Sequence, residues 1–350
     1  MKIAYILPSL INKGPIIVVQ NLVNELYKRK YDVEVYYFDD KFGVQFDCPT
    51  IKLNPQKPPK NFDKYDIIHS HGYRPDKFLF KIKKQLSKAK IVSTIHSHLE
   101  KDLAYSYNKI VSVVFATLWK KHLMRFDCVI TISHFLEKIY CKRIVNLTTV
   151  HNGISVCPNI SEADVDIVFQ IKQLKKGIVD KIIGAYASIT PIKGLHQVLN
   201  ILPEKKDWAM VIIGEGKEKN NLEKIVHKNG IKDRVLFLPY IQKPYNYLSL
   251  FDVYAMTSYS EGFGLALIEA AEAKIPIVCS DIPVFRELFN EDEVAFFTLD
   301  NKKSLSDAIE NSCDDKSSTE KAYKKNHINY STTAMVDGYL RVYEKLIDKK

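Results

Sequence analysis

The sequence predicts an α/β protein with two doubly wound parallel sheets, one in each half of the 350-residue chain. Short apolar runs alternate with segments whose apolar residues recur at helical spacing, and this alternation is typical of parallel sheets. The alternation restarts after Asn152-Gly153-Ile154, and the length of the chain suits two domains of ordinary size. We therefore expect a first domain over residues 1–155 and a second domain over residues 156–330.

The elements of both halves follow from these patterns in order. The strands of the first half are apolar, largely β-branched runs at residues 2–7, 33–38, 67–72, 91–96 and 128–133. Its helices are expected at 16–29, 77–88, 103–123 and 135–140. The second half repeats the scheme with strands at 182–188, 208–213, 235–238, 253–256 and 277–279. Its helices are expected at 163–175, 193–202, 265–273 and 333–347, with a further helix that ends at His227. Ligands of such sheets bind at the carboxyl ends of the strands.

Two helices of the first half need a closer description. The segment 77–88 places Phe78, Leu79, Ile82 and Leu86 on one face and lysines on the other, as in an amphipathic surface helix. The stretch 103–123 is apolar but is interrupted by lysine and serine, which indicates a core or interface helix. Nowhere does an apolar run reach the roughly 18 residues that a membrane span needs. With no signal-peptide pattern at the N-terminus, we expect a cytoplasmic protein.

Charge is distributed unevenly along the chain. Residues 1–160 hold 25 Lys and Arg against 13 Asp and Glu, so the first half carries the whole excess of the net charge of +10. This asymmetry indicates an anionic partner for the first half. The lysine-rich face is explained equally well by solvent exposure or by an anionic membrane surface, whereas nucleic acid is disfavoured because no binding motif accompanies the charge.

Metal binding is not expected. The six cysteines are dispersed without a Cys-x-x-Cys pair, which argues against a zinc site. Histidines cluster as His69/His71 and His96/His98, but no acidic or cysteine residue lies beside them in the sequence.

The segment 257–270 carries the clearest chemical signal. It predicts a buried strand, a Gly-Phe-Gly turn and a helix, with Glu261 in the turn and Glu269 in the helix. Gly262 and Gly264 let the backbone approach a ligand, and the helix N-terminus favours an anion there. Carboxylates accept hydrogen bonds from paired hydroxyls. The arrangement therefore suits a nucleotide-sugar, with its diphosphate on the helix end and the two glutamates on ribose and sugar.

The same segment closely resembles the Ser-x-x-Glu-Gly-Phe-Gly-Leu-x-x-x-Glu-Ala signature of the retaining glycosyltransferases of family 4. Asn152-Gly153-Ile154 and Lys193-Gly194 match further motifs of that family. The resemblance implies the GT-B fold, in which two Rossmann-like domains face each other across a cleft that holds the active site. It also implies that the last helix, residues 331–350, packs back on the first domain.

The resemblance assigns roles to individual residues. His96 and Glu261 would be catalytic, orienting and polarising the donor sugar. Donor binding would use Gly14, Ser188, Lys193, Gly214, Gly216, Ser258, Gly262, Phe263, Gly264, Leu265 and Glu269. Acceptor binding would use Asn12, His71 and Arg74. Two positions depart from the family, since Ser188 stands where an arginine is usual and Pro15 removes an amide from the first glycine loop.

The resemblance implies a retaining, metal-independent glycosyltransferase without a cofactor. The donor would be a UDP- or GDP-sugar, and the acceptor a saccharide, in lipid-diphosphate-linked form, for cell-surface polysaccharide of the O-antigen or capsule type. Such an enzyme would act at the inner face of the cell membrane. Two alternatives remain open at this point. One is a sugar-nucleotide epimerase or phosphorylase with the same fold, and the other is a non-catalytic partner subunit.

Overall fold

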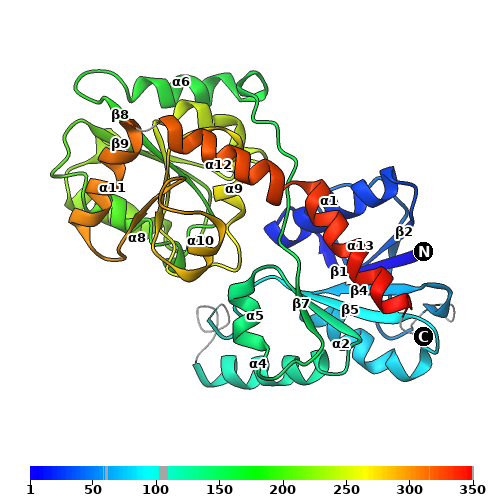
Figure 1. Cartoon of the computed structure of the whole chain (residues 1–350). Coiled ribbons are helices and arrows are strands. Elements are labelled where there is room, and N and C mark those ends of the chain that lie inside the picture. The colour runs from blue at the N-terminus through cyan, green and yellow to red at the C-terminus, as the bar shows by residue number, and fades with distance from the viewer. Residues whose placement is uncertain (58, 60–61, 102–108, 315, 349–350) are drawn as a thin grey trace. The chain divides into compact units, whose positions relative to one another are not determined.

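The computed structural model describes the chain except for residues 58, 60–61, 102–108, 315 and 349–350, and it divides into two compact units (Figure 1). The first unit comprises residues 1–155 and 329–350, and the second comprises residues 156–328. Each unit is built on one parallel sheet, so the predicted fold class is confirmed.

The sheet of the first unit has the strand order β3-β2-β1-β4-β5-β6-β7. Its strands are β1 (Lys2–Leu10), β2 (Asp32–Phe42), β3 (Thr50–Lys52), β4 (Ile67–His71), β5 (Lys90–Ile95), β6 (Cys128–Thr131) and β7 (Leu147–Thr149). Its helices are α1 (Gly14–Lys28), α2 (Tyr73–Ile82), α4 (Lys109–Leu123), α5 (His134–Tyr140) and α13 (Thr332–Asp348), with 3-10 turns at Phe62–Lys64 and Lys83–Gln85. Helices α1 and α13 pack together on one face of the sheet, and α2 and α4 pack together on the other (Figure 1).

The sheet of the second unit has the order β10-β9-β8-β11-β12-β13. Its strands are β8 (Lys181–Tyr186), β9 (Trp208–Ile213), β10 (Val235–Leu238), β11 (Val253–Met256), β12 (Ile277–Ser280) and β13 (Ala295–Phe297). Its helices are α6 (Val165–Gln173), α7 (His196–Leu199), α8 (Lys219–Lys228), α9 (Leu265–Glu272), α10 (Pro283–Leu288), α11 (Lys302–Asp314) and α12 (Lys316–Asn329). The 3-10 turns of this unit are Ile160–Glu162, Pro191–Lys193, Lys232–Arg234 and Pro244–Leu250. The core on one face joins apolar side chains of the central strands to those of α7, α8 and α11.

Several predicted bounds were wrong, each for a local reason. The lysine-faced helix, expected over 77–88, is α2, which ends at Ile82 and continues as a 3-10 turn to Gln85. Beyond that turn the carboxylate of Asp63 accepts hydrogen bonds from the amides of residues 87–89, so the helix does not reach Lys88. The helix expected over 193–202 shrinks to α7, because Gly194 adopts a left-handed φ of 60° and ends the turn before it. Strand β1, expected to end at Leu7, continues through Pro8 to Leu10. Pro8 has no N–H to donate, but the ladder with β4 already ends at Ile6, so no bond to β4 is lost there. The first part of the helix expected over 103–123 lies outside the described residues.

Candidate functional site

Both sheets change the direction of their strand order at one point. The order places β1 beside β4 in the first unit and β8 beside β11 in the second. Ligands of doubly wound sheets bind beside the carboxyl ends of the strands at such points. The predicted residues lie there: Gly14 follows β1 and His71 ends β4, while Ser188 follows β8 and Ser258 follows β11.

In the second unit, the turn after β11 brings together a lysine and a glutamate that are 68 residues apart in the chain. Lys193 Nζ lies 2.5 Å from Glu261 Oε1, and Ser258 Oγ donates to the same oxygen at 2.7 Å. The two charged side chains are 23% and 14% exposed, so the pair is partly shielded but open to a ligand. The structure thus unites a cation suited to a diphosphate with a carboxylate suited to sugar hydroxyls.

The turn leads into α9 through Gly264, whose φ of 115° is accessible mainly to glycine. A Cβ atom at this position would also lie 2.9 Å from the ring of Phe285. Phe263 is 2% exposed and anchors the turn in the second unit. Leu265 begins α9, and the amides of Leu267 and Ile268 donate to the carbonyl of Gly264, which leaves those of Leu265 and Ala266 in the first turn. This helix end therefore suits an anionic group.

Glu269 lies on α9 with a partner that the sequence did not reveal. Tyr186, at the end of β8, donates a hydrogen bond from its hydroxyl to Glu269 Oε2 at 2.6 Å. Burial raises the pKa of Glu269 to about 7, and the hydrogen bond from Tyr186 opposes that rise. Tyr186 is buried against the ring of Tyr254, so it holds the carboxylate in one orientation.

Gly214 and Gly216 keep the loop after β9 close to the loop after β8. A Cβ atom would lie 2.0 Å from the carbonyl oxygen of Ala187 at Gly214, and 2.1 Å from that of Ile189 at Gly216. The Ile189 amide also donates to the carbonyl of Glu215. Ser188 is exposed beside this contact. The two glycines therefore serve the packing of the loops that carry the predicted donor site.

In the first unit, the loop after β1 leads into a helix, but few backbone N–H groups at that helix start are free to bind an anion. Helix α1 begins at Gly14, Pro15 has no N–H, and the amides of Ile16 and Ile17 donate to the carbonyl of Lys13. Gly14 therefore carries the first-turn amide that remains for an anion. Asn12 precedes it and packs against Gly43, where a Cβ atom would lie 2.7 Å from the Asn12 nitrogen.

The predicted acceptor residues of the first unit differ in accessibility. Arg74 is exposed and pairs with both carboxylate oxygens of Asp39, at 2.6 and 3.0 Å. His71 is only 2% exposed, and its Nδ1 lies 2.8 Å from Nε2 of His96. His96 follows β5, is half-buried, and has its pKa lowered by burial to about 4. Both rings are therefore neutral at physiological pH, and His71 contacts His96 from within the unit. Ser133 caps α5 through a hydrogen bond from the Leu136 amide.

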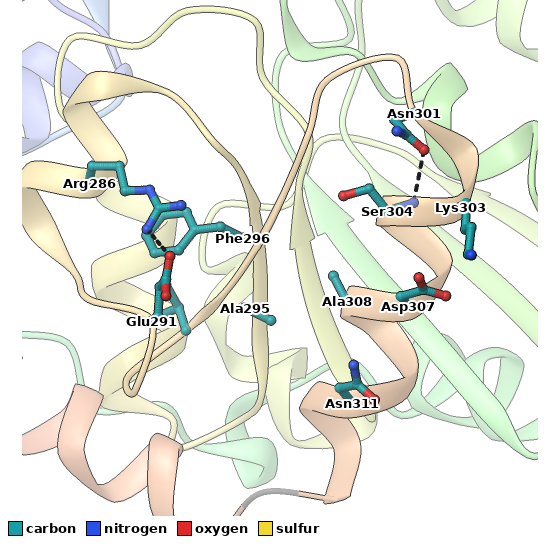
Figure 2. A pocket seen from close by; sticks show the side chains of 11 residues that line it. Arg286, Glu291, Ala295, Phe296, Asn301, Lys303, Ser304, Asp307, Ala308 and Asn311 are labelled. Atoms are coloured by element: carbon teal, nitrogen blue, oxygen red, sulfur yellow. Dashed lines mark hydrogen bonds and ion pairs between the residues drawn. The ribbon is translucent and has the colours of Figure 1, made fainter.

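A groove of about 520 Å³ lies elsewhere on the second unit, at the edge strand β13 (Figure 2). Its lining includes Arg286, which pairs with Glu291 and with Asp281. The predicted site residues do not line this groove. Within the lining, Arg286 pairs with Glu291, and Asn301 accepts a hydrogen bond from the Ser304 amide. Among the described residues, His, Cys, Asp and Glu side chains form no group of three that could hold a metal ion.

Comparisons with known proteins match the chain on both units. Residues 14–156 match the model "Glycosyltransferase Family 4", and residues 166–329 match "Glycosyl transferases group 1". The chain is 31% identical over 322 residues, 88% of each chain, to the O-antigen biosynthesis glycosyltransferase WclY of Escherichia coli. It is 33% identical over 122 residues to the N-acetylgalactosamine-N,N'-diacetylbacillosaminyl-diphospho-undecaprenol 4-alpha-N-acetylgalactosaminyltransferase of Campylobacter jejuni, covering 34% of this chain and 33% of that one.

Solved structures share the fold over the full chain. HepE of Anabaena, crystallised with UDP and glucose, has a TM-score of 0.80 and 16% identity, covering 98% of this chain and 99% of its own. Sucrose-phosphate synthase of Thermosynechococcus elongatus has a TM-score of 0.78 and 17% identity, covering 100% of both chains. These likenesses extend to both parallel sheets and confirm the expected GT-B architecture.

Proposed function

The chain is a glycosyltransferase that belongs to glycosyltransferase family 4, and from this we propose that it assembles cell-surface polysaccharide. In our proposal it moves a sugar from a nucleotide-sugar to a lipid-diphosphate-linked saccharide, with retention of configuration and without a metal ion. The observation that carries the proposal is the Lys193–Glu261 pair at the turn before α9. Glu269 lies one turn further along, within α9 itself. The names of the Escherichia coli and Campylobacter jejuni relatives support an O-antigen product and a lipid-linked acceptor.

The donor groups of the second unit would divide the nucleotide-sugar among them. Lys193 and the first-turn amides of α9 face the diphosphate, Glu269 accepts from the ribose hydroxyls, and Glu261 accepts from the transferred sugar. The departing phosphate would take the proton of the acceptor hydroxyl on the same face of the sugar, so the proposal needs no separate base. His96, neutral at physiological pH, would contact the sugar from the first unit.

The proposal is tested by thermal shifts against UDP-, GDP- and ADP-sugars, followed by transfer assays with the best ligand. We expect the sugars of one nucleotide to raise the melting temperature. At a ligand concentration a hundredfold above Kd, binding adds about 2.7 kcal/mol to the free energy of unfolding. Transfer should then require a saccharide acceptor and keep the anomeric configuration of the donor. Epimerisation or phosphate-dependent cleavage of the donor without acceptor would contradict the proposal.

We also propose that the first unit docks on an anionic membrane. Helix α2 buries Phe78, Leu79 and Ile82 and leaves its lysines outside, so its apolar face is not available to lipid. The neighbouring helix α4 instead exposes apolar side chains one and two turns apart, with exposed fractions of 45–78% for Ile110, Val113, Val114 and Leu118. Among the described residues, no helix is both long and apolar enough to cross a bilayer. Apolar side chains beside lysines suit shallow insertion with electrostatic attraction.

Sedimentation with lipid vesicles checks this docking. Each lysine near an anionic surface contributes on the order of 1 kcal/mol, and the Debye length falls from about 10 Å at 0.1 M salt to about 3 Å at 1 M. We therefore expect binding that needs acidic lipid and weakens with salt. It should drop when Lys81, Lys83, Lys84 and Lys88 become glutamine, and also in Ile110→Ser/Val114→Ser. Lys172→Gln/Lys176→Gln/Lys224→Gln/Lys228→Gln, which removes four exposed lysines from the other unit, is the matched control. Equal binding to neutral vesicles would contradict the proposal.

A further inference from the structure

The carboxyl ends of β4 and β5 hold a pair of histidines whose hydrogen bond fixes the position of one proton. His71 Nδ1 and His96 Nε2 are 2.8 Å apart, which is hydrogen-bond distance. Burial lowers the pKa of both rings below the ordinary value, and the neighbouring His69 and His96 add to the effect on His71. Each neutral imidazole carries one N–H, so one of the two rings donates and the other accepts.

The other nitrogen of His71 decides which ring donates. His71 Nε2 is buried and has no hydrogen-bond partner among the described residues. A buried N–H without an acceptor is rarer and more costly than an unpaired acceptor. The arrangement is therefore favoured when Nε2 of His71 carries no proton and Nδ1 of His71 donates to Nε2 of His96.

The plane of the His71 ring is held by stacking, and its edge is set by the bond to His96, since a ring turned over would place Cδ2 where Nδ1 lies and lose that bond. His71 stacks on His69 with ring centroids 4.3 Å apart and on Tyr5 at 5.9 Å. His69 is itself held at both nitrogens, by the Tyr343 hydroxyl at 2.6 Å and by Thr94 Oγ1 at 2.9 Å. The stack joins β1, β4 and helix α13 of the first unit.

We propose that His71 is a positioning residue that locks His96 in the tautomer with its proton on Nδ1. His96 then presents an N–H donor to the donor sugar and cannot act as a proton acceptor through the nitrogen that faces His71. The inference rests on the proposed function, because it takes His96 to be a group that contacts the sugar. It adds a role for a buried residue that does not itself reach substrate.

The experiment combines histidine ¹⁵N spectra with kinetics on the full-length chain. Long-range ¹H–¹⁵N correlation spectra distinguish the two tautomers, and loss of one signal set in His96→Gln assigns His96. In the wild type we expect a protonated Nδ1 on both His71 and His96. In His71→Leu, which removes the donor, His96 should move toward the other tautomer. The kcat/KM of the His71→Leu variant should fall about tenfold, the scale of one misplaced hydrogen bond.

Two further variants separate positioning from general damage. His71→Asn places an amide N–H near the position of Nδ1, so it should restore the Nδ1–H tautomer of His96 and most of the activity. His227→Asn, an exposed residue on α8, should change neither. The affinity for the bare nucleoside diphosphate should stay the same in all of them, because none of the altered residues is placed at the diphosphate.

The tautomer measurement needs no turnover, so it decides the inference even when no sugar transfer is found. A wild-type His96 with its proton on Nε2 would overturn the inference, and so would a folded His71→Leu with unchanged tautomer and unchanged kcat/KM. Absence of transfer from every nucleotide-sugar, with the expected tautomers in place, would instead contradict the proposed function alone.

Discussion

Lys193→Ala is expected to lower kcat/KM for sugar transfer about a hundredfold, the scale of losing one group that stabilises charge in the transition state. Lys193 Nζ is the cation that the structure places 2.5 Å from Glu261, at the carboxyl end of the central strands of the second sheet. As the glycosidic bond breaks, negative charge develops on the departing diphosphate. The lysine and the N-terminus of α9 would meet that charge in the absence of a divalent ion.

Transfer rates in the presence of excess chelator complete this test. We expect the wild type to keep its activity, since the proposed site uses no metal. Lys224→Ala, which removes an exposed lysine from α8 of the same unit, should behave like the wild type. Glu261→Ala should lower turnover without weakening the binding of the bare diphosphate, because it removes the carboxylate proposed to accept from the sugar and leaves the Lys193 cation in place. A strict requirement for magnesium or manganese, or full activity of Lys193→Ala, would contradict the assignment.

The strands and the central turn could be predicted because their signals are local. Val253–Met256 is an apolar run, and Gly262 and Gly264 mark the turn that follows. The periodicity of the sequence also separates the two sheets. Edge elements such as β3 and β13 were missed because each has only three residues, too few to show a period.

The bounds of helices depended on contacts that local patterns do not contain. The helical run of α2 and its 3-10 turn stops at Gln85, although Leu86 continues its apolar face, because Asp63 captures the amides of residues 87–89. Helix α6 starts at Val165 because Asp164 caps it through the amides of Asp166 and Ile167. In both cases one carboxylate, hydrogen-bonded to backbone amides, decides where the helix can run.

The partners within the site were even less accessible to sequence reasoning. Lys193 and Glu261 were both expected at the donor site, but not their direct pairing. Tyr186 lies 83 residues from Glu269 and carries no motif of its own. His71, expected to touch the acceptor, is buried behind His96 and contacts that ring. These side-chain contacts join segments that follow neighbouring strands of a parallel sheet. Local sequence patterns do not reveal the order of the strands, so they do not reveal the contacts.

Glu269→Ala is expected to weaken the binding of the nucleoside diphosphate by about 1.5–3 kcal/mol, the scale of hydrogen bonds to a charged group. Glu269 would accept from the ribose hydroxyls, and the Tyr186 hydroxyl donates to its Oε2 at 2.6 Å. Titration calorimetry on the folded variant measures the change. Glu223→Ala, which removes an exposed carboxylate from α8, should bind like the wild type. Unchanged affinity of a folded Glu269→Ala would refute the assignment.

The same carboxylate predicts a pH dependence of binding. Burial raises the pKa of Glu269 to about 7, so the group gains a proton as the pH falls through neutrality. The ionised form accepts hydroxyl hydrogen bonds better than the protonated form, so affinity should be full above the pKa and decline below it. If ribose binds only the carboxylate, affinity falls about tenfold from pH 8 to pH 6. The diphosphate also titrates in this range, so Glu269→Gln, which cannot ionise, provides the comparison. The excess slope of the wild type over Glu269→Gln isolates the glutamate, and parallel slopes would mean that Glu269 does not bind the ribose as a carboxylate.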